Sequence, residues 1–411
     1  MLYRSGLALF TLPSPGCRTL VFIHQNIPAQ FRYLAPAMAA SGHRVIFITN
    51  GEAPPPRGVY KAHYKIDAAK ESPEIAQVRY ASRVAKTLLQ LKNQHGVVPD
   101  LMIGHSSWGE LMFVRDVFPK VPLLAYFEWF HHDELFREFD PDYDHNPNAP
   151  FVLRMKNVPN YVAGDICSAG ISPTYWQYST FPRELQSKIN VIHDGVDTQA
   201  IRRPAKPALR LPDGRLITRD QEVVTYVARG LEPVRGIRPV FRAFAELLRK
   251  RPNAQVIVIG GEKTSYGNPL PEGETHKQQM LAEVDLDLSR VHFLGRVPYQ
   301  TFLGALYVSR AHVYFTYPFI LSWSMMEAMA AECLVIGSRT SPVEEVIRDG
   351  HNGILVDFHD HAALAARLDE ALAHPDRFEP LRREARRTIL ERYDLHGICL
   401  PRQKALIDSL R

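Results

Sequence analysis

The chain has 411 residues, of which 45% are hydrophobic and 23% charged, a composition typical of a globular protein with room for two domains of about 200 residues each. The net charge of +5 and the lack of any block of five basic residues argue against a nucleic-acid-binding arm; such an excess suits anionic small molecules or an anionic membrane surface. Four scattered cysteines without a C-x-x-C pair argue against a disulfide framework or a zinc site. The sequence has no run of about 20 apolar residues, so we expect no membrane span.

Short apolar runs alternate with helical patterns along the first half, which predicts βαβ units on a parallel sheet. A helical pattern over residues 29–40 contains Pro36, which should bend the helix or cost it a backbone hydrogen bond. Residues 131–160 are rich in polar and turn-forming types, so we expect an irregular insertion there. The expected strands are 19–24, 44–49, 101–104, 122–126, 166–171 and 190–193.

A stretch over residues 196–218 contains three prolines and many charges, which indicates a linker between two halves. A second βαβ series follows it and ends in two helical patterns, 361–373 and 378–392. The sequence therefore predicts an α/β protein with two similar halves and a cleft between them, and ligands should bind beyond the carboxyl ends of the strands. The strands expected in this half are 223–228, 255–260, 291–294, 313–315 and 334–336.

Two arginines flank the first turn of the second half. Arg229 falls at the end of a predicted strand, and Arg235 falls just before the next helix. Two guanidinium groups beside a helix N-terminus form a suitable site for a diphosphate. The alternative is two ordinary surface arginines.

Glu327 admits two interpretations. Ser324-x-x-Glu327 matches a capping box, in which the carboxylate satisfies a free backbone N–H at a helix start. The same carboxylate could instead bind a ribose diol. No Asp or Glu occurs from Leu288 to Met326, so the chain offers no second acid just upstream.

Two groups in the first half are candidates for catalysis. Glu128 lies among aromatic residues, which should desolvate its carboxyl and raise its pKa, as in a poised acid or base. A Glu paired with a nearby Arg or His is the alternative. His105 follows a strand beside small residues and could face a ligand, although a lone histidine is often structural.

The turn after the first strand lacks the glycines of a phosphate-binding loop. Its polar side chains, His24, Gln25 and Asn26, could bind the hydroxyl groups of an acceptor. The alternative is a simple entry into the following helix. The adjacent residues His131 and His132 should point to different sides of regular structure, so no metal site is expected.

With these residues, the chain resembles the retaining family-four glycosyltransferases with the GT-B fold. The resemblance covers nearly the whole chain and rests on several motifs together. In the first half these are Gly42-His43, the strand ending at His105, and residues 191–197; in the second half they are Arg229 with Arg235-Gly236, residues 327–330, Ser338, residues 345–350 and residues 352–356.

The resemblance implies two Rossmann-like domains: an acceptor-binding domain over 1–198 and a nucleotide-sugar-binding domain over 199–390, with a C-terminal helix in 391–411 that packs back on the first. It implies transfer of a hexose-type sugar from a nucleotide-diphosphate donor, in which the sugar is linked to UDP or GDP, with retention of the anomeric configuration. No cofactor or metal is expected, because the basic pair neutralises the leaving diphosphate. Arg229 and Arg235 would hold the diphosphate, and Glu327 the ribose.

The sequence departs from the family at one central position. Phe319 stands where the E-x7-E motif has its first Glu, which contacts the hydroxyls of the donor sugar, and Ile320 and Ser322 replace glycines. We therefore expect the role of the missing first Glu to be shared by Glu128, His105 and the backbone N–H groups of Ile320, Leu321 and Ser322.

Three classes of function remain open. The first is a cytoplasmic transferase that adds sugars to a glycan or lipid-linked acceptor in envelope or capsular polysaccharide synthesis, with contact to the inner membrane face left open. The second is a nucleotide-sugar 2-epimerase, against which the acid-free stretch counts. The third is a non-catalytic nucleotide-sugar-binding module, for which Phe319 is the main argument.

Overall fold

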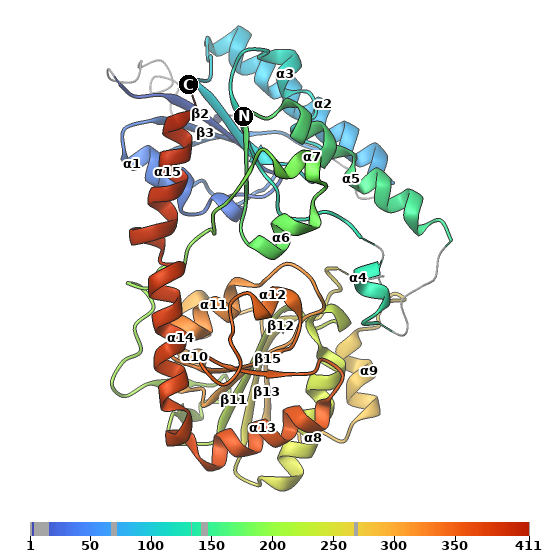
Figure 1. Cartoon of the computed structure of the whole chain (residues 1–411), viewed down its shortest axis with the longest axis vertical. Helices are drawn as coiled ribbons and strands as arrows, with labels where there is room; N and C mark the ends of the chain where they lie inside the picture. Colours follow the sequence, from blue (N-terminus) through green and yellow to red (C-terminus); the bar gives the residue numbers. More distant parts are fainter. Residues whose placement is uncertain are drawn as a thin grey trace. The chain divides into compact units, whose positions relative to one another are not determined.

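A computed structural model describes residues 2–3, 16–66, 72–132, 134–140, 147–266 and 270–410. These residues form two compact units, each a sheet with helices on both faces (Figure 1), which confirms the predicted α/β class with two Rossmann-like domains. The first unit takes the described parts of Met1–Asp133, His145–Gly195 and His396–Arg411. The second takes those of Glu134–Asp144 and Val196–Leu395.

The sheet of the first unit has the order β1-β4-β3-β2-β5-β6-β7-β8, in which β2 to β8 run parallel and β1 pairs antiparallel with β4. Every residue of β2 and β5 is buried, as expected for parallel strands covered on both faces. The strands are β1 Leu2–Tyr3, β2 Thr19–Ile23, β3 Arg44–Thr49, β4 Val59–His63, β5 Leu101–His105, β6 Leu123–Tyr126, β7 Ala169–Ser172 and β8 Ile189–Val191.

Helices α1 and α15 cover one face of this sheet, and α2, α3 and α5 cover the other (Figure 1). The C-terminal helix α15 is fixed by buried Ile407 and by Arg18, whose guanidinium donates to the carbonyl oxygens of Ile407 and Leu410. The helices are α1 Leu34–Ala40, α2 Pro73–His95, α3 Val114–Val117, α5 Ala149–Ile166, α6 Tyr175–Thr180, α7 Arg183–Gln186 and α15 Leu400–Ser409.

The second unit has six parallel strands in the order β13-β12-β11-β14-β15-β16. Its largest apolar cluster packs α10, α11 and α14 on one face, while α8 and α13 lie together on the other (Figure 1). The strands are β11 Val223–Gly230, β12 Gln255–Gly261, β13 Val291–Gly295, β14 Ala311–Tyr314, β15 Leu334–Ser338 and β16 Ile354–Val356. The helices are α4 Glu134–Arg137, α8 Ile237–Lys250, α9 His276–Glu283, α10 Tyr299–Val308, α11 Trp323–Ala330, α12 Ser341–Glu344, α13 His361–Ala373 and α14 Glu379–Arg392.

Two segments differ from the irregular structure that their composition predicts. Residues 149–166 form the long helix α5, and the proline-rich stretch contains the antiparallel hairpin of β9 (Ala208–Arg210) and β10 (Leu216–Thr218). Helix α4 packs within the second unit, where Phe136 contacts the rings of Tyr317 and Phe319. Within the described part of the chain, no helix has the length and apolar character needed to cross a bilayer.

Candidate functional site

Arg235 is held rigidly at the carboxyl edge of the second sheet. It ends a 3-10 turn, Pro233–Arg235, that leads directly into α8, and its side chain is 5% exposed. Its Nη1 donates to the Tyr314 hydroxyl (3.2 Å), the Thr316 hydroxyl (3.0 Å) and the carbonyl oxygen of Ile320 (3.0 Å). All three bonds to described residues use Nη1, which leaves the donors of Nε and Nη2 for a ligand.

Gly236 makes this placement possible. Its φ of +75° lies in the left-handed region, and a Cβ there would stand 2.4 Å from the Cβ of Phe315. Only glycine combines that backbone conformation with that close approach. The junction between the turn and α8 therefore sits tightly on the strand end that carries Tyr314.

Two aromatic rings flank the two arginines. The guanidinium carbon of Arg235 lies 5.2 Å from the Phe319 ring centroid and 5.6 Å from that of Tyr266. Arg229 lies 5.8 Å from the Tyr266 ring and donates to its hydroxyl at 3.2 Å. The rings themselves meet edge to face at 4.7 Å. We call Arg229, Arg235, Tyr266 and Phe319 the arginine–aromatic cluster, in which cation–π attraction holds the two guanidinium groups against the rings.

Glu232 fixes the position of Tyr266. This fully buried carboxylate accepts from the backbone N–H groups of Ser265 and Tyr266, both at 2.9 Å. The turn that presents Tyr266 follows β12, at the edge where ligands of parallel sheets bind. Tyr266 and Glu232 were absent from the residues singled out in the sequence; the position of Tyr266 just beyond a strand is the signal that points to it.

Phe319 is buried among other aromatic side chains. It is 4% exposed and contacts Phe136 of α4 at 5.5 Å in addition to Tyr266. An aromatic side chain thus takes the place at which the family resemblance implies a carboxylate, and its ring is packed against Arg235.

The loop after Phe319 is unstrained. Among the described residues other than glycine, only Ala29 and Glu332 have positive φ, so Ile320 does not adopt the conformation that a glycine would favour. The Ser322 N–H donates to the Tyr314 hydroxyl at 2.7 Å, and Leu321 is buried. In this structure the Ser322 N–H is therefore engaged inside the protein, contrary to the expectation that it contributes to sugar binding.

Glu327 is not part of a capping box. The N-cap of α11 is Ser322, whose hydroxyl accepts from the Ser324 N–H, so Glu327 lies in the second turn of the helix. Its carboxylate is 6% exposed and accepts from the Tyr299 hydroxyl at 3.0 Å. The capping interpretation was wrong because the helix begins two residues earlier than the pattern suggested; the ribose-binding role stays a prediction.

In the first unit, Glu128 and His105 form a pair. Strand β5 ends at His105, and Glu128 follows β6, so the neighbouring strand ends bring Glu128 Oε2 to 3.2 Å from His105 Nε2. His105 Nδ1 accepts from the Ser107 N–H, which places the ring proton on Nε2, facing the carboxylate. The other Glu128 oxygen accepts from Gln30 Nε2 at 2.8 Å. Glu128 is therefore paired with a histidine, the alternative considered for it.

Of the three polar residues after β2, His24 lies beside this pair. Its ring is 5.2 Å from that of His105, and its pKa is well below the ordinary value because it is buried and, to a lesser degree, because His105 is near. His24 is thus neutral at pH 7. Gln25 is half-buried and accepts through its carbonyl from Thr49, whereas the Asn26 side chain is exposed. Binding of an acceptor by these residues stays a prediction.

A buried acid lies near these residues. Glu110 is 0% exposed, and burial raises its pKa from 4.5 to about 7, against the opposing effect of its own backbone N–H and that of Gln25. A carboxyl whose pKa is raised on folding stabilises the fold fully below pH 4.5 and loses that contribution as the pH rises through 7. A rise of this size corresponds to about 3 kcal/mol.

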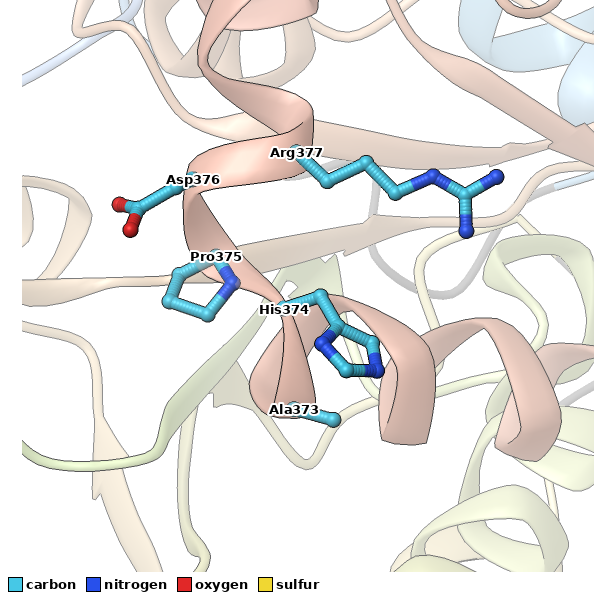
Figure 2. A pocket seen from close by; sticks show the side chains of 5 residues that line it. All are labelled: Ala373, His374, Pro375, Asp376 and Arg377. Carbon is cyan, nitrogen blue, oxygen red and sulfur yellow. The ribbon is translucent and has the colours of Figure 1, made fainter.

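A surface hollow of about 460 Å³ lies elsewhere, at the end of α13, and is lined by residues 373–377. Figure 2 shows that the side chains of Asp376 and Arg377 extend to opposite sides of the backbone. Arg377 pairs with Glu370. Because α13 begins beyond the carboxyl end of β16 and runs back, the hollow lies at the amino edge of the sheet, away from the arginine–aromatic cluster.

Known proteins resemble both halves of the chain. Residues 41–201 match the family described as "Glycosyl transferase family 4 group", and residues 211–388 match "Glycosyl transferases group 1". The D-inositol 3-phosphate glycosyltransferase of Corynebacterium jeikeium is 30% identical over 158 residues, 38% of this chain and 36% of that protein. That of Mycobacterium tuberculosis is 31% identical over 194 residues, 45% of this chain and 36% of that protein. The matched part is thus about a third of the length of these relatives.

Solved structures show the fold. Sucrose-phosphate synthase of Thermosynechococcus elongatus has a TM-score of 0.74 at 16% identity, over 95% of this chain and 99% of that one. The HepE protein of Anabaena, in complex with UDP and glucose, has a TM-score of 0.67 at 16% identity, over 96% and 100%. Their likeness establishes the GT-B fold. Together with the two family matches, it shows that the chain belongs to the family-four group of glycosyltransferases.

Proposed function

We propose that the protein transfers a sugar from a nucleotide-diphosphate donor to a glycan or lipid-linked acceptor, with retention of the anomeric configuration. The arginine–aromatic cluster is the observation that carries the proposal. Two guanidinium groups, one of them fixed by three hydrogen bonds, lie beside the N-terminus of α8, and this arrangement suits a diphosphate.

The cluster supplies the charge that the leaving group needs. When the bond between sugar and diphosphate breaks, negative charge develops on the diphosphate, and positive groups held in advance stabilise it without reorganisation. A guanidinium keeps its charge at any working pH. We propose that Arg229 and Arg235 do this without a metal ion, and that Glu327 binds the ribose.

The donor is proposed to carry UDP or GDP. Two related structures support a uridine donor: HepE has been solved in complex with UDP-glucose, and the trehalose-phosphate synthase of Burkholderia vietnamiensis is UDP-forming. Both bases therefore belong in the test.

Acid–base work is proposed for the Glu128–His105 pair. A carboxylate held by an imidazole N–H and an amide can accept a proton and pass it on, and such groups typically contribute about 10² to 10⁴ in rate. His24, Gln25 and Asn26 are proposed to contact the acceptor.

The test is release of free nucleotide from a panel of UDP-, GDP-, ADP- and dTDP-sugars, with Arg235→Ala beside the wild type. Release from one donor that is lost in the variant supports the transferase. Release that persists unchanged in Arg235→Ala contradicts it.

One observation favours a second candidate, a module that binds a nucleotide sugar without reacting. Phe319 puts a buried ring where a carboxylate would contact the donor sugar. This candidate predicts tight binding of a nucleoside diphosphate but no turnover with any donor and acceptor. An epimerase would need acids facing the sugar, and the acid-free stretch from Leu288 to Met326 argues against it.

A further inference from the structure

The first unit carries an unusual helical surface. Helices α2 and α5 lie side by side on one face of its sheet (Figure 1). Among the described residues, thirteen large apolar side chains are prominently exposed, and six of them lie on these two helices. They are Ile75, Val78 and Leu89 on α2, and Phe151, Met155 and Tyr161 on α5, with exposed fractions of 41 to 68%. We call the exposed sides of these two helices the α2–α5 face.

The helix period explains how α2 presents this face. Val84, Leu88 and Leu91 recur at the helical spacing and are buried against the sheet. On the opposite side, Arg83 and Lys86 are exposed next to the exposed apolar residues. Helix α2 thus packs an apolar side against the core, and its outer side combines basic and apolar groups.

Between their terminal turns, helices α2 and α5 carry charges of one sign only. From Ile75 to Pro99 there are four Lys or Arg residues and no Asp or Glu, and from Ala149 to Gly164 there are two and none. These six positive charges exceed the net charge of +5 for the whole chain, so the rest of the chain is nearly neutral. Within the two helices, acids occur only in the terminal turns: Glu74 in the first turn of α2 and exposed Asp165 in the last turn of α5.

We propose that the α2–α5 face docks onto an anionic lipid surface. Exposed apolar side chains beside Lys and Arg are the chemistry of an interfacial helix, in which apolar groups enter the headgroup region and basic groups attract anionic lipids. The complementary charge is what selects a lipid surface as the occupant. The inference needs no transfer activity, so its failure and that of the proposed function are separable.

The experiment is co-sedimentation of the full chain with vesicles of phosphatidylcholine alone and of phosphatidylcholine mixed with phosphatidylglycerol, without nucleotide. The wild type should bind the mixed vesicles and should bind them less as salt is raised, because exposed charges are screened. Failure to bind mixed vesicles, or equal binding to both kinds, overturns the proposal.

Variants locate the face. Each basic group near an anionic surface is worth about fivefold in partition, so the double variant Arg83→Gln/Lys86→Gln should bind roughly 25-fold more weakly. The double variant Arg202→Gln/Lys206→Gln removes the same charge from exposed positions of the second unit and should bind like the wild type. Equal losses in the two variants contradict the proposal.

The apolar contribution has its own pair of variants. Phe151→Ser should weaken binding roughly tenfold, whereas Leu390→Ser, at an exposed apolar position of α14, should not. Unchanged binding in Phe151→Ser overturns the apolar part. Unfolding midpoints measured on all variants show whether a loss of binding comes from a loss of fold; in that case Lys86→Gln alone, with an expected fivefold loss, decides.

Discussion

Replacing Tyr266 tests whether its ring positions the two arginines of the arginine–aromatic cluster. Tyr266 faces both guanidinium groups, at 5.8 and 5.6 Å, and its hydroxyl accepts from Arg229. Cation–π contacts contribute about 0.5–1 kcal/mol at exposed sites and about 2 kcal/mol when desolvated. Removing both contacts in Tyr266→Ala should therefore cost about 2 kcal/mol of diphosphate binding, which raises the dissociation constant roughly 30-fold.

Tyr266→Phe is the matched conservative variant. It keeps both ring contacts and removes only the hydrogen bond to exposed Arg229, so the expected weakening is about two- to fivefold. Tyr175→Ala, at a 64% exposed position of the first unit, is the control and should change nothing.

The assay is calorimetric titration with UDP and GDP and, in parallel, with uridine and guanosine. The Tyr266 ring positions the arginines that bind the diphosphate, so the nucleosides should bind all variants equally. If Tyr266→Ala bound the diphosphate as tightly as the wild type, or if its affinity for the nucleoside fell by the same factor as its affinity for the diphosphate, Tyr266 would have no positioning role.

Three further predictions concern stability and rate. Denaturant titration of the wild type and of Glu110→Gln should show that the wild type loses about 3 kcal/mol of unfolding free energy relative to the variant between pH 4.5 and pH 8. If the difference in unfolding free energy between the two proteins did not change with pH, the buried carboxyl would not titrate as stated. Gly236→Ala should lower the free energy of unfolding by about 3 kcal/mol or more. Gly214→Ala should lower it by only about 1 kcal/mol, because Gly214 has a similar φ of +90° but no atom lies within 4 Å of the added Cβ. Equal losses in the two variants would refute the packing argument. Glu128→Gln and His105→Ala should each lower kcat at least tenfold with a smaller change in KM, and full activity in both would remove the pair from the reaction.

Much of the fold could be predicted because parallel strands buried on both faces are continuous apolar runs. Residues 19–23 and 334–338 are such runs, and they form β2 and β15. The alternation of strands and helices then predicts two doubly wound sheets. The helix α5 was missed because Pro150 and Pro159 lie in it and polar residues precede it; Pro150 is accommodated in the first turn, and tertiary packing buries Asn157 and Asn160.

Part of the candidate site could be predicted for the same reason. Arg229 and Arg235 were found because they lie at a strand end and a helix start, features that the sequence pattern locates. Their aromatic partners could not be found in this way. Tyr266 reaches Arg235 only through a turn fixed by buried Glu232, and Phe136 reaches Phe319 across more than 180 positions of sequence. Such contacts depend on tertiary packing, which local patterns do not encode.

The most direct test of the donor site compares the affinities of the wild type and of Arg235→Ala for UDP, GDP and the corresponding nucleosides. We expect one of the two diphosphates to bind the wild type and to bind Arg235→Ala at least 30-fold more weakly, whereas the nucleoside should bind both proteins equally. If Arg235→Ala bound that diphosphate as tightly as the wild type, the arginine–aromatic cluster would not be the donor site.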